Sequence, residues 1–191
     1  MGRFETHKMS VRKILTKIKT TELKKMKKQV RFTVTAGIIA ALYAMLTYLS
    51  AAMGLAYGPV QFRLSEGLCV LAAVTPAAIP GLTVGCLVAN LSSPFGVVDI
   101  ICGTAATLIA ALAGYIFRKI KLWDFPIIAM LSPVVANALI VGAEIAAFSA
   151  TEAFASVFWI TAAEVAVGEL VVCVALGGAV WSLTKKTDIF K

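Results

Sequence analysis

The chain has 191 residues, of which 60% are hydrophobic and 15% are charged, and its mean hydropathy is +0.90. A water-soluble domain carries about 25% charged residues, so this balance excludes a soluble enzyme, a DNA-binding module and a disulfide scaffold, and indicates a membrane protein. The net charge is +8, but eleven of the 18 Lys and Arg lie at or before Arg31, and the next 86 residues contain only Arg63. The basic charge is therefore a signal of membrane topology.

Residues 1–30 are predicted to be a basic cytoplasmic segment. Apolar residues recur at helical spacing between Val11 and Met26, among many lysines. This pattern is typical of an amphipathic helix on an anionic membrane surface. A disordered basic tail that only sets the topology is the alternative, and Met26 offers an alternative start of the chain, which leaves the role of residues 1–25 open.

Six membrane-spanning helices are predicted between residues 31 and 184. A span needs about 20 residues, and glycine and proline breaks divide this region at matching intervals. The expected helices cover residues 32–53, 61–75, 80–91, 98–117, 126–148 and 156–183. The second and third are short for a span, and the uncharged link from Pro76 to Pro80 turns them back on each other.

Three basic clusters set the predicted topology. They are the N-terminal segment, the group of Arg118, Lys119 and Lys121, and the tail over residues 185–191. Positive residues favour the cytoplasmic side, so an even number of spans must separate each pair of clusters. We therefore expect an all-α membrane protein with four spans, then two, and with both termini in the cytoplasm.

Polar residues within the predicted spans are the candidates for function, because a charged side chain at the centre of a membrane helix costs about 2.5–3.5 kcal/mol on insertion scales. On this topology they gather in the outer half of the bundle, as in a cup that opens outward, whereas a pore needs polar lining throughout. The candidate substrate-binding residues are Arg63, Glu66, Asn90, Asp99, Asn137, Glu144, Glu164 and Glu169.

The charge of this set constrains the ligand. One arginine and five carboxylates have a formal charge of −4. In a low-dielectric interior such a charge is unfavourable unless it is compensated. Either some acids are protonated or the ligand supplies donors, and we favour a small ligand rich in N–H groups. Glu164 and Glu169 are five residues apart, about 140° around a helix, so they point in different directions.

Several of these candidates also have a purely structural interpretation. Arg63 and Glu66 are three residues apart and could neutralise one another on one helix face. Asp99 could cap a helix, and Asn137 could join two helices by a hydrogen bond.

The first predicted span carries a ridge of small residues. Such residues let helices approach closely, either within the bundle or against a partner protein. The ridge consists of Ala36, Gly37, Ala40, Ala41 and Ala44.

Motifs for catalysis and for energy supply are absent from the sequence. There is no GxxxxGK[ST] loop for ATP and no HExxH zinc motif, and no Ser/His or Cys/His arrangement suits covalent catalysis. The cysteines occur singly in apolar runs, as Cys69, Cys86, Cys102 and Cys173. We therefore expect no catalytic residue, no metal and no cofactor, and no enzymatic activity.

Two stretches, GPVQFRLSE at residues 58–66 and TPAAIPGL at residues 75–82, resemble the QueT family of substrate-binding (S) components of energy-coupling factor (ECF) transporters. The resemblance covers about residues 28–185, whereas Gly67 and Ala72 depart from the family pattern around the second helix. Later positions that match it, in order, are residues 85–90, Phe95, Gly96, Asp99, Gly103, Pro133, Asn137, Glu144, Gly168, Glu169 and Cys173.

This resemblance implies a six-helix S component in the cell membrane that takes up a queuosine precursor, such as a deazaguanine base. Its implied partners are a transmembrane coupling protein and two ATPase subunits. The resemblance implies that the small-residue ridge is the surface that contacts the coupling protein. It also ranks Glu169 ahead of Glu164 as the ligand-facing acid. The alternatives are an S component for another vitamin or heterocycle, an intramembrane enzyme that uses Glu66 and Asp99, and a membrane scaffold. The particular precursor, and whether the coupling module is shared, stay open.

Overall fold

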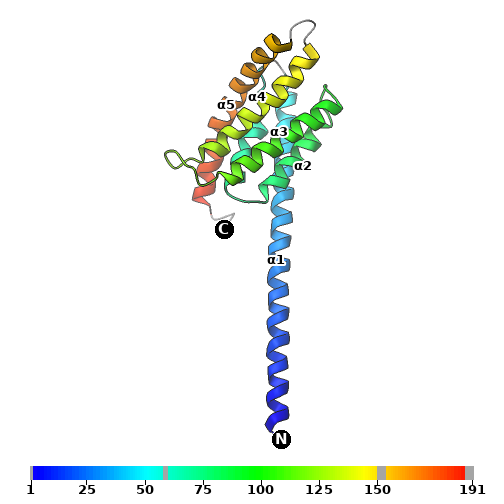
Figure 1. Cartoon of the computed structure of the whole chain (residues 1–191), viewed down its shortest axis with the longest axis vertical. Coiled ribbons are helices and arrows are strands. Elements are labelled where there is room, and N and C mark those ends of the chain that lie inside the picture. The colour runs from blue at the N-terminus through cyan, green and yellow to red at the C-terminus, as the bar shows by residue number, and fades with distance from the viewer. Residues whose placement is uncertain (1, 58–59, 150–153, 188–191) are drawn as a thin grey trace. The chain divides into compact units, whose positions relative to one another are not determined.

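The computed structural model describes residues 2–57, 60–149 and 154–187, with side chains from residue 19 onward. Over these residues the protein is all-α, as predicted, and the only β pairing is one isolated bridge between Leu122 and Phe125. The chain divides into two units, residues 1–34 and 35–191, which are described separately. The elements are α1 (Gly2–Ala52), the 3-10 helix η1 (Leu64–Ala73), α2 (Ala78–Asn90), α3 (Val97–Ile116), α4 (Ile127–Ser149) and α5 (Phe154–Lys186) (Figure 1).

The N-terminal unit is the first part of α1. The helix begins at Gly2, about thirty residues before the predicted start of the first span, because neither glycine nor proline occurs between Gly2 and Gly37 to end it. Lys25 forms an ion pair of 3.5 Å with Glu22, one turn away on the exposed surface. Contact of this basic segment with a membrane surface remains a prediction.

Four helices of the described residues are long and apolar enough to cross a membrane. They cover Lys19–Ala52, Val97–Ile116, Ile127–Ser149 and Phe154–Lys186. The structure has six helical elements, as predicted. The second and third, η1 and α2, were predicted as spans but are too short to be candidate spans. The 13 residues of α2 extend about 20 Å at 1.5 Å per residue, less than the hydrocarbon thickness of about 30 Å.

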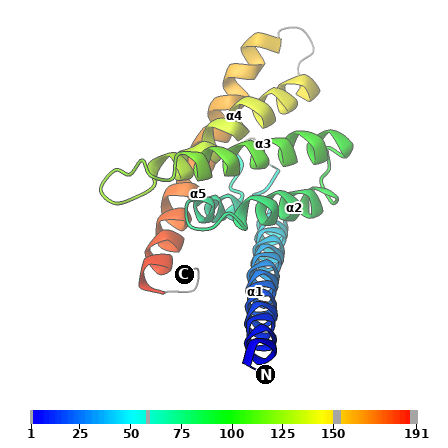
Figure 2. The ribbon, with the colours of Figure 1, turned by 60° about the horizontal axis from the view of Figure 1, so that its bottom comes forward.

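The short helix η1 lies at the centre of the second unit. It contacts α2, α3, α4 and α5, and its residues from Ser65 to Ala72 are all buried. Figures 1 and 2 show α3 lying between α2 and α4, with α5 packed along α4. Because other helices surround η1, its residues other than Ser65 and Glu66 are apolar or glycine on all sides, and its sequence resembles that of a span.

The helix α2 packs closely against the small residues of α1. A Cβ atom added to Gly81 would lie 2.8 Å from the carbonyl oxygen of Ala36, and one added to Gly85 would lie 2.7 Å from that of Ala40. Two glycines therefore permit the two backbones to approach. Part of the predicted ridge is used inside the bundle, while Gly37 and Ala41 remain exposed.

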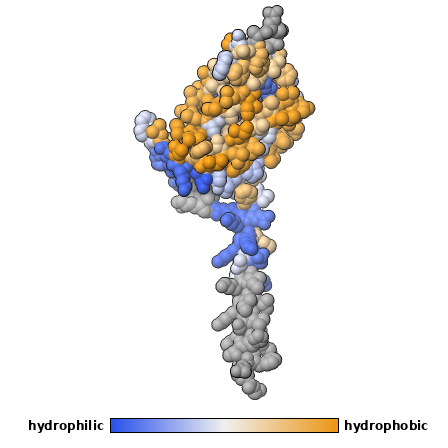
Figure 3. Space-filling model, viewed as in Figure 1, coloured by the Kyte–Doolittle hydropathy of each residue, from blue (hydrophilic) through white to orange (hydrophobic). Residues whose placement is uncertain are grey.

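The surface of the second unit is mostly apolar. Large exposed side chains such as Ile109, Leu139 and Val171 occur along α3, α4 and α5, and Figure 3 shows hydrophobic residues over most of the visible face. Such a surface is suited to contact with lipid chains.

Candidate functional site

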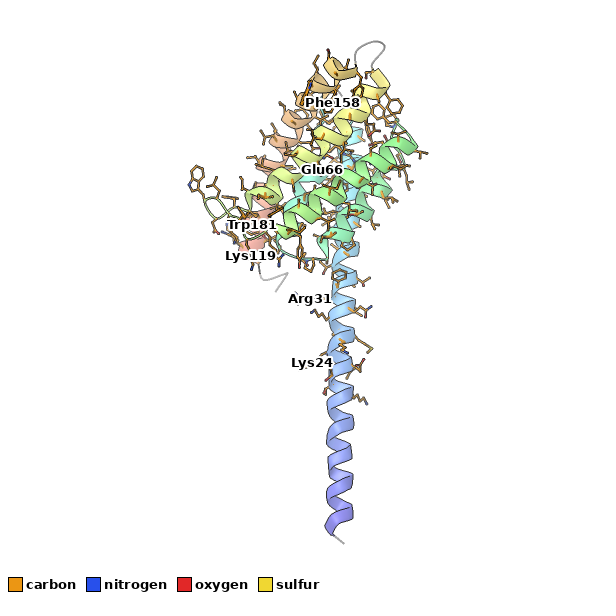
Figure 4. All side chains as sticks on the ribbon, in the orientation of Figure 1. Lys24, Arg31, Glu66, Lys119, Phe158 and Trp181 are labelled. Carbon is orange, nitrogen blue, oxygen red and sulfur yellow. The ribbon has the colours of Figure 1, made fainter. Side chains whose placement is uncertain are left out.

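The candidate site is a cluster of buried polar side chains in the middle of the helical bundle. Figure 4 shows Glu66 between the end that carries Phe158 and the opposite end, where Lys119 and Trp181 lie. Seven of the eight predicted residues are buried, with at most 5% of each residue exposed. They are Arg63 before η1, Glu66 on η1, Asn90 on α2, Asp99 on α3, Asn137 and Glu144 on α4, and Glu169 on α5.

Glu164 is the exception among the predicted residues. It lies five residues before Glu169 on α5 and is only partly buried, whereas Glu169 has no exposed surface. The close approach of α5 to the loop before η1 is possible because residue 168 is glycine, since a Cβ there would lie only 2.8 Å from the carbonyl carbon of Gln61. Of the two acids on α5, only Glu169 is therefore fully buried in the bundle, and its contact with a ligand stays a prediction.

Arg63 is held by Asn90. Its Nη2 donates a hydrogen bond of 2.7 Å to Asn90 Oδ1, and Asn90 Nδ2 donates one of 2.9 Å to the backbone oxygen of Asp99. The amide of Asn90 is thus used on both sides, and it connects Arg63 to the start of α3. Asn90 thus positions the guanidinium, while Arg63 Nε has no hydrogen-bond partner among the described residues.

The ion pair between Arg63 and Glu66, which we considered from their spacing, is not formed, and the only ion pairs of the described residues involve other side chains. Arg63 has an extended backbone, with φ −85° and ψ 96°, and precedes η1. It therefore does not share a helix face with Glu66.

Glu66 instead accepts hydrogen bonds from α1 and from its own helix. The Tyr43 hydroxyl donates to Oε1, and Cys69 Sγ donates to Oε2 at 3.2 Å. Tyr43 is fully buried, and its hydroxyl also lies 3.3 Å from that of Thr107. Tyr43 and Thr107 were not predicted from the sequence. Each places a hydroxyl group within an apolar helix, and a buried hydroxyl needs a hydrogen-bond partner, which is the signal that could have identified them.

The remaining acids carry most of the unsatisfied polar atoms. Four carboxylate oxygens, Asp99 Oδ2, both oxygens of Glu144 and Glu169 Oε1, are buried without a hydrogen-bond partner in the described protein. Two donors, Arg63 Nε and Asn137 Nδ2, are also buried without a hydrogen-bond partner in the described protein, and so is the Thr104 hydroxyl. Each unsatisfied buried group costs about 1–3 kcal/mol, and charged groups cost more, so a set of this size calls for an explanation such as ligand binding.

These groups belong to one electrostatic cluster. Glu144 lies within electrostatic range of Asp99 and Arg63. Glu169 lies within range of Glu66, Arg63 and Asn137, although Asn137 Nδ2 has no hydrogen-bond partner in the described protein. With Glu66 included, four carboxyl groups face one guanidinium, which leaves a formal charge of −3 if all are ionised. The arrangement can accept several hydrogen bonds and can donate few, so it fits a ligand with N–H donors or positive charge.

An apolar groove elsewhere does not contribute to this site. It lies between α3 and α4, has a volume of about 510 Å³ and is lined by residues such as Ile109, Leu131 and Leu139. None of the buried acids lines it. The described residues also contain no group of three or more His, Cys, Asp or Glu that could hold a metal ion.

Comparisons with known proteins identify relatives of the chain. Residues 33–186 match the family described as QueT transporter. A protein of Lactococcus lactis subsp. cremoris (strain MG1363) called queuosine precursor transporter QueT is 37% identical over 95 residues, which cover 48% of this chain and 56% of that protein. The match thus spans little more than half the length of this relative. No solved structure matches the chain.

Proposed function

The chain belongs to the QueT transporter family, and on that premise we propose that it is the substrate-binding subunit of an ECF importer for a queuosine precursor. Family membership and the apolar helices together make it a multi-pass membrane protein. Membership of a transporter family is also consistent with the expectation that the chain is not an enzyme.

The observation that supports this proposal best is the excess of unsatisfied acceptors in the buried cluster. A deazaguanine base presents a ring N–H and an exocyclic amine side by side, and one carboxylate can accept both hydrogen bonds. Glu169 is the proposed acceptor for these two groups, and Glu144 is the proposed acceptor for an aminomethyl branch of the base. Asn137 Nδ2 and Arg63 Nε are donors that suit the carbonyl oxygen of the base.

The proposed coupling to ATP hydrolysis rests on other features. The sequence contains no GxxxxGK[ST] loop, and the proposal assigns the energy supply to ATPase subunits that act through a coupling protein. Gly37 and Ala41 are the exposed part of the small-residue ridge and form the proposed contact with that protein. The proposed topology places both termini in the cytoplasm, as the basic clusters predict, with η1 and α2 as short helices inside the bundle.

Isothermal titration of the purified full-length protein tests the proposal. We expect binding to at least one of a panel of deazaguanine bases, and weaker binding to guanine, which differs at ring position 7. Glu169→Gln should weaken that binding and Glu164→Gln should not, because only Glu169 is fully buried in the cluster. Binding of an unrelated heterocycle instead would favour the alternative, an S component for another vitamin. Binding of no base, or equal losses in both variants, would contradict the proposed site.

A further inference from the structure

A strained, exposed turn joins α3 to α4. The backbone N–H of Leu122 donates to the oxygen of Phe125 at 2.9 Å, and that of Phe125 donates to the oxygen of Leu122 at 3.0 Å. Between them, Trp123 has φ 47° and Asp124 has φ 70°. Two positive φ angles in succession define a type I′ turn, which glycine and asparagine favour. A tryptophan and an aspartate here are strained, so their surroundings must hold the turn.

Contacts with the end of α5 hold this turn in place. The indole Nε1 of Trp181 donates a hydrogen bond of 3.0 Å to the backbone oxygen of Asp124. The Asp124 carboxylate forms ion pairs with Lys185 and with Lys121, the latter at 3.9 Å. The amino groups of both lysines also lie over the Trp181 ring, 5.6 Å and 5.3 Å from its centre. The turn is therefore fixed against α5 from several sides.

The fixed turn presents an unusual surface. Trp123 is 90% exposed, and the neighbouring Leu122 and Phe125 are also exposed. Five basic side chains are grouped at this end of the unit, where Asp124 supplies the one carboxylate among the described residues; the five are Arg118, Lys119, Lys121, Lys185 and Lys186. Figure 3 shows hydrophilic residues gathered at one end of the apolar surface, and Figure 4 shows Lys119 and Trp181 toward the same end of the bundle.

The position of this surface identifies its partner. It lies where the candidate spans α3 and α5 end and α4 begins, the level at which lipid headgroups lie. Tryptophan is enriched at that level because its ring is apolar while its N–H is polar, and lysines there attract anionic headgroups. We propose that the turn and its basic residues bind the phosphates of anionic lipids, with the Trp123 ring inserted at headgroup depth.

A local readout tests this proposal, since the basic N-terminal helix is also expected to attract anionic lipid. The full-length protein is reconstituted in vesicles with equal parts of phosphatidylcholine and phosphatidylglycerol, with bromine on the acyl chains of one lipid or of the other. The difference in tryptophan fluorescence between wild type and Trp123→Phe isolates the Trp123 signal. We expect brominated phosphatidylglycerol to quench this signal more strongly than brominated phosphatidylcholine.

Charge reversals distinguish lipid binding at this turn from a general attraction of anionic lipid to a basic protein. Lys119→Glu with Lys186→Glu leaves the Asp124 contacts in place, and we expect the preference for phosphatidylglycerol to fall by on the order of fivefold for each lysine. The control pair, Lys24→Glu with Lys27→Glu, makes the same charge change on exposed positions of α1 and should keep the preference. No preference in wild type, or equal loss in the control pair, would overturn the proposal. Shielding of Trp123 from both lipids would do so too, and would indicate a protein partner instead.

Discussion

The hydroxyl of Tyr43 on α1 donates a hydrogen bond to Oε1 of Glu66 on η1, which links the first helix to the centre of the polar cluster. Both residues are at most 1% exposed, so without this bond Glu66 would keep only the Cys69 thiol as a donor and Tyr43 only the more distant Thr107 hydroxyl. Removal of a hydrogen bond to a charged group costs about 1.5–3 kcal/mol. Tyr43→Phe should therefore lower the stability of the protein, measured by thermal unfolding in detergent, and should weaken ligand binding.

Tyr48→Phe is the matched control for this change. Tyr48 lies on the same helix, is exposed, and donates to the backbone oxygen of Val88 at 3.0 Å. Its loss should cost less, because the acceptor is neutral and also accepts a hydrogen bond from the backbone N–H of Leu91. Equal effects of the two substitutions would mean that the bond to Glu66 has no special weight.

Glu144 and Asn137 provide a prediction about affinity. Their unsatisfied atoms are expected to bind ligand, so Glu144→Gln and Asn137→Ala should each weaken binding by roughly 10- to 150-fold, the equivalent of about 1.5–3 kcal/mol. Titration calorimetry measures the effect, and fluorescence-detected size exclusion checks that each variant is folded. Wild-type affinity in both variants would remove α4 from the site.

The contact between Arg63 and Asn90 predicts a specific energetic coupling. A double-mutant cycle of Arg63→Gln and Asn90→Ala should give an interaction energy within the range of about 0.5–3 kcal/mol seen for residues in contact. A cycle of Arg63→Gln and Glu66→Gln should give a smaller value, since no ion pair joins these residues. If the second cycle shows the larger coupling, the pair inferred from spacing exists in solution.

Helix α1 permits a test of coupling to the transport partner. Ala40 packs against Gly85, so Ala40→Trp should disturb the fold and is a poor test of docking. Ala41 is exposed, and Ala41→Trp should leave ligand binding unchanged while it reduces uptake by cells and co-purification with the coupling protein. Normal uptake by this variant would assign the small residues to internal packing alone.

The burial of the polar residues could be predicted from the sequence for a physical reason, whereas their contact with a ligand stays a prediction. An ionisable group in an apolar helix is stable only when it faces the protein interior, so Asp99, Glu144 and Glu169 could be expected to gather. The partners within the cluster could not be predicted, because spacing along the chain suggested Glu66 for Arg63, and the extended backbone at Arg63 directs it to Asn90.

The spans were harder to predict than the cluster. The apolar run of η1 is buried on all sides, and hydrophobic periodicity alone cannot separate such a segment from a spanning helix. Its start at Leu64 could not be predicted, because neither glycine nor proline occurs between Pro59 and Leu64 to mark it. The continuous helix from Gly2 was not predicted, because the change from basic to apolar composition suggested that a new helix begins near residue 32.

The central claim is that buried carboxylates recognise N–H donors of the ligand, and one comparison of ligands tests it most directly. The measurement is the affinity of the protein for a bound deazaguanine base and for its analogue without the exocyclic amine, in wild type and in Glu169→Gln. We predict that wild type loses roughly 10- to 150-fold in affinity for the analogue, and that Glu169→Gln distinguishes the two ligands far less. Equal affinity of wild type for both ligands would contradict the account.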